Sequence, residues 1–387
     1  MVLFEPSRLG GRNRGVQAPM VASRSADVAG HTSGTNAMSQ LRLGIAGAGR
    51  FGQLHAAVLS ALPDVTLAAI ADPCAERCQH LADRHQVARR YGSTQDLFDD
   101  AELDAFVLVT PDEQHGDQGL AAVATGKPVF IEKPLASSSQ QAMALQKAAA
   151  ASGSLLQTGL LLRYELQHAL LQEELAAGRF GELVSIRVKR NLSAAWFSAV
   201  ADRAHTVFES LIHDLDLLLW LSGSRATRVM AMERRFGTHQ SPEGCYALIE
   251  LASGCVAMAE TSWFVPPQAP ANVMTETWAG TIDAELAVVG TQQTAQLRLL
   301  DSPLTIWGQD QQRHPDAQLW PLHQGHIHGA LERELADFTN AARTGIPSRT
   351  ASLDQAIEGL RLAEAIVEAG RTGQAVAMPR LVADPQS

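Results

Sequence analysis

The stretch that decides the fold is residues 41–52, which read Leu-Arg-Leu-Gly-Ile-Ala-Gly-Ala-Gly-Arg-Phe-Gly. An apolar strand leads directly into Gly47-x-Gly49-x-x-Gly52, and a helical pattern follows over 51–62. In dinucleotide-binding turns the first glycine makes the tight turn, the second admits the phosphates, and the third lets helix and strand pack closely. The positive end of the helix then faces the anion. The stretch predicts such a turn, although a glycine-rich turn without a ligand has the same spacing.

A second apolar strand, 65–71, ends in Asp72, which lies 20 residues after Gly52. A carboxylate in this place hydrogen-bonds the adenosine ribose hydroxyls of NAD and repels the additional phosphate of NADP. Pro73 follows at once, and Arg77 lies one turn further on. We therefore expect NAD, with NADP as the alternative. A helix-capping role for Asp72 before Pro73 stays open.

Composition limits the class of protein. The 387 residues are long enough for two domains, and 46% apolar with 19% charged residues is typical of a folded chain. The net charge of −10 argues against a nucleic-acid partner. No apolar run reaches the roughly 18 residues that a membrane span needs. Residues 1–39, rich in Gly, Arg, Ser and Ala, lack the apolar core of a signal peptide and read as a disordered extension.

Four scattered cysteines are too few for a disulfide framework in a chain of this length. Cys74 and Cys78 are one helical turn apart, but no convincing His or acidic partner accompanies them, so a metal site is not favoured. Reduced thiols and a cytoplasmic location are expected.

The first part of the chain, 40–158, alternates strands and helices, which predicts a Rossmann-type, doubly wound parallel sheet. Strands are expected at 41–46, 65–71, 105–110, 128–132 and 154–159, and helices at 50–62, 74–86, 113–125 and 138–152. The second part, 159–387, is rich in successive strands and predicts an α+β domain with a large, mostly antiparallel open sheet. Its strands are expected at 183–189, 226–235, 246–251, 255–263, 281–289 and 295–300, with helices at 163–177, 325–343 and 353–371.

Two polar strings follow buried strands of the first part, at the carboxyl edge where ligands bind in open α/β sheets. Thr110-Pro111 leads to His115, which either lines the nicotinamide side or caps a helix. Glu132-Lys133 precedes Pro134, a candidate for a cis peptide bond. The ammonium of Lys133 is placed to stabilise an alkoxide formed as hydride leaves, or is an ordinary surface lysine.

A third set lies on one predicted helix. At 100° per residue, Glu209, His213, Asp216 and Trp220 share one stripe of an otherwise apolar helix. A buried polar stripe is either paired or functional. A carboxylate one turn from His213 is expected to orient the imidazole and raise its pKa, as suits proton transfer. A cluster that only ties this helix to a neighbour remains the alternative.

Two further groups of residues invite a functional interpretation. His323, His326 and His328 suggest either zinc or, for His326, a substrate pocket. Loops near 191–205 and 264–278 carry aromatic residues that either stack on a sugar ring or pack internally: Trp196, Phe197, Trp263, Phe264 and Trp278.

The three sets together resemble the Gfo/Idh/MocA oxidoreductase family, named for glucose-fructose oxidoreductase and inositol dehydrogenase. The resemblance covers about residues 41–379, and the strings that carry it are the 44–55 glycine segment, Thr-Pro-Asp-Glu-Gln-His over 110–115, Gly-Lys-Pro-Val-Phe-Ile-Glu-Lys-Pro-Leu over 126–135 and Ile-His-Asp-Leu-Asp over 212–216. The resemblance implies NAD(P)-dependent transfer of hydride between nicotinamide and a secondary alcohol of a sugar, inositol or related polyol. It also implies a homodimer or homotetramer formed through the sheet of the second part.

By resemblance, Lys133 corresponds to the active-site lysine, His213 to the catalytic histidine, and Arg163 to an arginine with a structural or cofactor-side role. Glu209 stands where inositol dehydrogenase-like members carry Asp, which puts a strict inositol assignment in doubt. The expected catalytic residues are Lys133, His213 and Glu209, with no metal. The expected cofactor-binding residues are Gly47, Gly49, Arg50, Phe51, Gly52, Asp72, Thr110, Pro111, His115, Glu132 and Lys133.

Two other functions are compatible with these residues. Some members of the family are glycosidases that use bound NAD transiently, and these release no net NADH. A non-catalytic nucleotide sensor with a partner protein is the second alternative, and it does not require the lysine and histidine that this chain retains.

Overall fold

The computed structural model describes residues 40–274, 279–301, 304–309 and 312–380. The expected disordered extension, 1–39, lies outside these residues. Residues from Gln40 onward form one compact unit, and the expected division at 158/159 stays a prediction.

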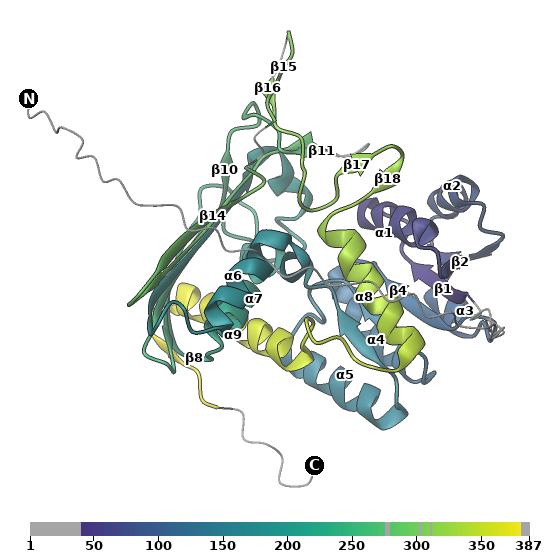
Figure 1. Ribbon diagram of the computed structural model, residues 1–387, viewed down its shortest axis with the longest axis horizontal. Coiled ribbons are helices and arrows are strands. Elements are labelled where there is room, and N and C mark those ends of the chain that lie inside the picture. Colours follow the sequence, from purple (N-terminus) through teal and green to yellow (C-terminus); the bar gives the residue numbers. More distant parts are fainter. Residues whose placement is uncertain (1–39, 275–278, 302–303, 310–311, 381–387) are drawn as a thin grey trace, which may run out of the picture. The chain divides into compact units, whose positions relative to one another are not determined.

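The first sheet has six parallel strands in the order β3-β2-β1-β4-β5-β6, as expected of a doubly wound fold (Figure 1). Its strands are β1 (Leu41–Ala46), β2 (Val65–Ala71), β3 (Arg89–Tyr91), β4 (Ala105–Leu108), β5 (Val129–Ile131) and β6 (Leu156–Thr158). The helices between them are α1 (Arg50–Ala61), α2 (Ala75–His85), α3 (Thr94–Phe98), α4 (His115–Val123) and α5 (Ser139–Ser152). The order of strands reverses between β1 and β4, which is where such sheets bind ligands.

The strands β4 and β5 are buried along their whole length because helices cover both faces of the sheet. Strand β3 was not expected. It is a three-residue edge strand of Arg-Arg-Tyr, too short and too polar to show an apolar run.

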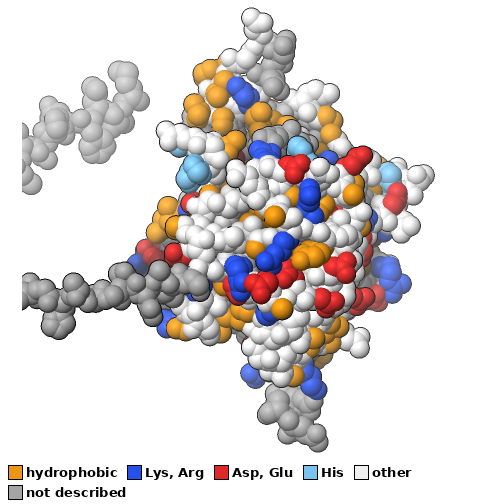
Figure 2. All heavy atoms as spheres, turned by 90° about the vertical axis from the view of Figure 1, so that its right-hand side faces the viewer, with side chains coloured by type: hydrophobic (Ala, Val, Ile, Leu, Met, Phe, Trp, Pro, Cys, Tyr) orange, Lys and Arg blue, Asp and Glu red, His pale blue; other side chains and the backbone are white. Residues whose placement is uncertain are grey.

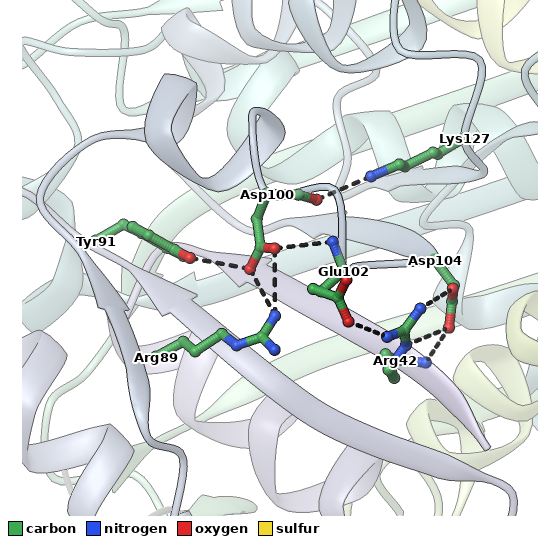
Figure 3. A network of polar contacts seen from close by, with 7 residues as sticks. All are labelled: Arg42, Arg89, Tyr91, Asp100, Glu102, Asp104 and Lys127. Carbon is green, nitrogen blue, oxygen red and sulfur yellow. Dashed lines mark hydrogen bonds and ion pairs between the residues drawn. The ribbon is translucent and has the colours of Figure 1, made fainter. Parts of the chain in front are cut away.

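Polar residues join the edge strand β3 to the segments that precede β4 and β5 (Figure 3). Asp100 accepts hydrogen bonds from the Tyr91 hydroxyl (2.9 Å) and from Arg89 (3.0 Å). Arg42 bonds Asp104 just before β4 (3.0 Å). Lys127, just before β5, donates to the Asp100 carbonyl at 2.9 Å. These contacts tie the segment 100–104 to β1, to β3 and to the residues before β5.

The second sheet has seven strands in the order β14-β13-β7-β10-β9-β8-β19. They are β7 (Leu183–Ser193), β8 (Ala226–Arg234), β9 (Gly244–Leu251), β10 (Val256–Val265), β13 (Ile282–Gly290), β14 (Thr294–Leu299) and β19 (Val376–Ala377). All neighbours are antiparallel except β7 and β10. The sheet is therefore mixed, because the long connection from β7 brings β10 alongside it in the same direction.

Helices cover one face of the second sheet (Figure 1). They are α6 (Leu166–Ala176), α7 (Ile212–Ser222) and α9 (Leu353–Thr372), while α8 (Ala330–Thr344) packs on α1. Short helical turns lie at 112–114 before α4, at 161–164 before α6 and at 194–199. A π-helical turn, Val207–Leu211, leads into α7. Within the described ranges, no helix is both long enough and apolar enough to cross a lipid bilayer.

Short two-stranded pairings complete the chain: β11 (Val273–Met274) with β12 (Ala279–Gly280), β15 (Ile306–Trp307) with β16 (Gln312–Arg313), and β17 (Leu322–His323) with β18 (His326–Ile327). The expected helix over 325–343 is therefore wrong at its start. Gln324 and Gly325 both have positive φ, which makes a tight hairpin turn and excludes helix there. On the side of α2 and α3, basic and acidic side chains intermingle (Figure 2).

Two buried ion pairs position α7. Arg163 makes a double hydrogen bond to Asp216, at 2.8 and 2.6 Å, and its guanidinium lies 5.3 Å from the ring centre of Trp220. Arg190 of β7 bonds Asp214 at 2.6 and 3.1 Å. Asp216 and Trp220 of the predicted polar stripe are therefore structural, because their partner is a buried arginine.

We expect Asp216→Asn to lower the free energy of unfolding by about 3–5 kcal/mol, because it leaves the Arg163 charge buried without its partner. Urea unfolding of the purified protein measures this change. Glu102→Gln, which breaks an exposed pair with Arg42, is the control and should cost much less. Equal losses in the two variants would contradict this account of α7.

Candidate active site

The glycine turn has the geometry that its sequence predicts. Gly47 has a φ of +102° and donates its N–H to Ala71 at 2.8 Å, so the turn also ties β1 to β2. A Cβ on Gly52 would collide with the Gly47 carbonyl, so this position fits only glycine. A Cβ on Gly49 would meet nothing within 4 Å. The first helical turn therefore faces open space, as a bound pyrophosphate requires.

Asp72 ends β2 beside this turn and is only 5% exposed. Its Oδ2 accepts the Ala48 N–H at 2.8 Å, and its Oδ1 accepts the Cys74 N–H at 2.8 Å. Arg77 donates to the same Oδ1 at 2.9 Å. The carboxylate thus braces the glycine turn as well as facing the cavity beside it.

A cavity of about 550 Å³ runs along the carboxyl edge of the first sheet. It brings together the residues that the sequence predicted for the cofactor, with the exception of Gly52, which packs behind the turn: Gly47, Gly49, Arg50, Phe51, Asp72, Thr110, Pro111, His115, Glu132 and Lys133. The cavity extends to Glu209, which comes from the π-helical turn before α7. The residues present fit a dinucleotide.

His115 is buried, and its ring contacts two backbone carbonyl groups. Its Nδ1 lies 2.7 Å from the Pro134 carbonyl and its Nε2 lies 2.8 Å from the Thr110 carbonyl. Because both ring nitrogens face carbonyl oxygens, the ring joins the segment after β4 to the segment after β5. The peptide bond between Lys133 and Pro134 is cis, as anticipated. His115 therefore positions Lys133, which neither interpretation of the sequence foresaw.

Glu132 lines the cavity, and its carboxylate contacts His55 and the backbone of Lys133. Its Oε1 lies 3.1 Å from His55 Nε2, and its Oε2 accepts the backbone N–H of Lys133 at 2.9 Å. Burial opposes ionisation, but His55 and Lys133 outweigh it and hold the pKa of Glu132 below its ordinary value. Burial, and then the charge of Glu132, raise the pKa of the fully buried Glu334 well above its ordinary value. The two pKa shifts have opposite directions, so ionisation is favoured at Glu132 and disfavoured at Glu334.

Lys133 lies at the junction of two cavities. Its Nζ donates to the carbonyl oxygen of Glu209 at 3.1 Å, which joins the first sheet to the π-helical turn before α7. Lys133 also lines a smaller cavity of about 30 Å³, whose wall includes His213. The structure therefore brings the predicted lysine and histidine to the same place, although they are 80 residues apart.

The imidazole of His213 is half-buried and enters none of the hydrogen bonds among the described residues. Desolvation by its neighbours, followed by the charges of Lys133 and Arg190, lowers the pKa of His213 well below its ordinary value. The expectation that a carboxylate raises this pKa is wrong. A neutral imidazole is the form that accepts a proton at neutral pH.

Glu209 is turned away from the predicted pairing. Its carboxylate lies 3.3 Å from Arg203. The cause is local: over Val207–Leu211 the chain is π-helical, and the Ile212 N–H bonds the Val207 carbonyl five residues back. A π-helical turn is wider than an α-helical one, so the spacing of 100° per residue does not hold over this segment. The prediction that used this spacing therefore placed Glu209 and His213 too close together.

Arg203 is the main residue that sequence reasoning missed. It lines the large cavity and forms ion pairs with Asp112 and Glu113 (3.5 Å) as well as with Glu209. It thereby links the segment after β4 to the turn before α7. No local signal marks Arg203, because its acidic partners Asp112 and Glu113 are about 90 residues away in the sequence.

The remaining candidates lie elsewhere. Phe197 and Trp263 are buried with their ring centres 5.7 Å apart, and Trp196 donates to the Ala279 carbonyl, so these rings pack on the protein. Phe264 contacts Phe236, but both of these rings are exposed. Trp278 lies outside the described residues. His323, His326 and His328 belong to the β17–β18 hairpin and its end, and no group of metal-ligating side chains exists among the residues described.

Comparison with known protein families agrees with this geometry. Residues 41–160 match the oxidoreductase family with an NAD-binding Rossmann fold, and residues 168–296 match the Gfo/Idh/MocA C-terminal domain. The chain belongs to the Gfo/Idh/MocA family. It is accordingly an NAD-dependent oxidoreductase.

Members of the family with known names align over most of the chain. The rhizopine catabolism protein MocA of Rhizobium meliloti is 27% identical over 336 residues, which cover 86% of this chain and 95% of that protein. The scyllo-inositol 2-dehydrogenase (NAD+) of Bacillus subtilis is 24% identical over 345 residues, 87% of this chain and 96% of that one.

Solved structures share the fold. The myo-inositol 2-dehydrogenase of Lactobacillus plantarum has a TM-score of 0.75 at 21% identity, covering 88% of this chain and all of that one. GenD2 from gentamicin A biosynthesis, solved with NAD, has a TM-score of 0.76 at 22% identity, covering 88% and 97%.

The glycine geometry predicts different results for two substitutions. Gly49→Val should leave thermal unfolding close to that of the wild type but abolish NAD binding in calorimetry, because the new side chain enters open space where phosphates approach. Gly52→Ala should instead destabilise the fold by about 1–3 kcal/mol, because its methyl group meets the Gly47 carbonyl. A Gly49→Val variant that binds NAD normally would refute this placement of the pyrophosphate.

Proposed function

We propose that this protein oxidises a secondary hydroxyl group of a cyclic polyol or sugar, or catalyses the reverse reaction, with Lys133 and His213 as its catalytic residues. The observation that carries the proposal is the convergence of these two side chains at the carboxyl edge of the first sheet, next to the cofactor cavity. The names of the relatives, which include inositol dehydrogenases, support a polyol substrate.

The chain supplies two groups for the chemistry. The neutral imidazole of His213 removes the proton of the hydroxyl group. The ammonium of Lys133 stabilises the resulting alkoxide. Bound NAD supplies the hydride acceptor. Glu132, ionised beneath Lys133, keeps a negative charge close to that ammonium.

Substrate access requires a local movement. The cavity beside His213, of about 30 Å³, has room for roughly one water molecule. The expected polyol-sized space between cofactor and α7 is therefore missing from this conformation. Releasing the Lys133–Glu209 hydrogen bond would join the two cavities, and it would free the ammonium for the substrate. We propose that substrate replaces the Glu209 carbonyl as the partner of Lys133.

We expect NADH to accumulate when the enzyme is incubated with NAD and a substrate from a panel of inositols, aldoses and amino sugars. Lys133→Met should lower kcat by about 100-fold to 1,000-fold, as removal of one stabilising donor does, while NAD affinity is kept. Absorbance of NADH and calorimetric titration with NAD measure the two quantities.

Lys127→Met is the matched control, because Lys127 lies before the amino end of the same strand, β5, where its ammonium bonds the Asp100 carbonyl and lies over the Phe106 ring. It should retain the activity of the wild type. Unchanged turnover in Lys133→Met, or an equal loss of turnover in both variants, would refute the assignment. Product formation without net NADH would identify the transient-oxidation glycosidase instead, and NAD binding without turnover across the panel would favour a sensor.

We also propose that the protein is a cytoplasmic homo-oligomer that associates through the uncovered face of the second sheet. A row of apolar side chains crosses that face where Met230, Leu248 and Met258 are cross-strand neighbours. Met232, 75% exposed, adjoins Tyr246 in the next row. Exposed apolar surface of this extent is typical of an interface.

Charged pairs of both signs border the row, including Arg228 with Glu250 and Lys189 with Asp283. A surface that carries both signs can pair with a copy of itself about a twofold axis. The cytoplasmic location accords with four cysteines that are all free.

We expect Leu248→Asp to convert the oligomer to monomers, because it places a charge in the centre of the apolar row. Analytical ultracentrifugation measures the mass. Leu170→Asp on α6 is the control, since Leu170 is similarly exposed (51% against 45%) but lies outside this face. A wild-type protein that sediments as a monomer would exclude the proposed interface.

A further inference from the structure

Arg77 has a place at the cofactor cavity that the proposed reaction leaves unexplained. It lies in the first turns of α2 and lines the same cavity as Asp72 and Thr94. Its side chain is 55% exposed, while the Asp72 side chain it contacts is 6% exposed. The guanidinium is therefore free to turn toward the cavity, whereas the carboxylate is fixed.

The hydrogen bonds of Asp72 bear on how it recognises a ribose. Two backbone N–H groups, of Ala48 and Cys74, already occupy one acceptor position on each oxygen. Arg77 takes a further position on Oδ1, at 2.9 Å. A carboxylate that stands alone at this place repels the 2′-phosphate of NADP. Here the repulsion is opposed by a cation in direct contact with the carboxylate.

We propose that Arg77 makes the adenosine end of the cavity tolerant of a 2′-phosphate, so that this chain uses NADP as well as NAD. With NAD, the ribose hydroxyl bonds Asp72 and Arg77 keeps its place on Oδ1. With NADP, the guanidinium turns from Asp72 to the phosphate, for which its planar set of donors is suited. The inference rests on the nicotinamide cofactor of the proposed function and not on its substrate.

The same geometry allows a second role for Arg77 in cofactor binding. A half-exposed guanidinium at the adenosine end can stack on the adenine ring, which is common to both cofactors. Stacking alone would therefore contribute equally to the affinity for NAD and for NADP. The two roles differ in one quantity, the ratio of the two dissociation constants.

The test is calorimetric titration of the full-length protein with NAD+ and, separately, with NADP+. For the wild type we expect both cofactors to bind. Arg77→Ala should raise the ratio of the NADP to the NAD dissociation constant at least about tenfold, as expected for loss of one charge-assisted contact. Arg77→Lys, which keeps the charge without the planar fork, should fall between the two.

Arg90→Ala is the control. Arg90 pairs with Asp83 outside the cavity, so this substitution removes the same charge at a different place. It should leave the ratio unchanged. An equal loss of both affinities in Arg77→Ala, an unchanged ratio, or a wild type that does not bind NADP would each overturn the proposal. A wild type that binds neither cofactor would refute the cofactor site itself. The ratio of kcat/KM with the two cofactors gives an independent reading in the same variants.

Discussion

The hydrogen bond from the Lys133 ammonium to the Glu209 carbonyl is the contact on which the active site depends. Lys133 follows β5 of the first sheet, and Glu209 lies in the π-helical turn that leads to α7. The contact is therefore the point at which the cofactor cavity meets the helix that carries His213. Its two ends are fixed independently: His115 holds the segment of Lys133, and Arg163 with Asp216 holds α7.

The electrostatics of the site follow from this arrangement. Lys133 is a cation close to a desolvated imidazole, so His213 stays neutral and able to accept a proton. The pKa of Glu132 stays low because His55 and Lys133 compensate for its burial, whereas burial, followed by the charge of Glu132, raises the pKa of Glu334 well above its ordinary value. Burial and the neighbouring charges together shift the pKa of each group, and the cluster as a whole avoids an unpaired buried charge.

The two faces of the second sheet have different roles. One face packs on α6, α7 and α9 and so sets the position of His213 relative to the first sheet (Figure 1). The other face carries Met230, Met232 and Leu248 toward solvent. The face that supports the site is thus distinct from the one available to a partner, and association need not disturb the catalytic residues.

The sequence by itself determined the elements whose signals are local. The turn at Gly47, Gly49 and Gly52, the acid that ends β2, and the lysine that ends β5 could be identified because the carboxyl edge of a parallel sheet collects the residues that follow its strands. The alternation of strands and helices predicted the first sheet apart from the short polar β3, and the run of successive strands predicted the second sheet apart from the two-residue β19.

Tertiary structure alone decided which side chains are partners. Glu209 was expected beside His213, but the π-helical turn changed the helical spacing, and the carboxylate pairs with Arg203 instead. Asp216 joined Arg163, 53 residues away in the sequence, and His115, which lines the cofactor cavity, also contacts two backbone carbonyls. Periodicity describes neighbours within one regular element, whereas these contacts join separate elements, and only the packing of the two sheets brings such residues together.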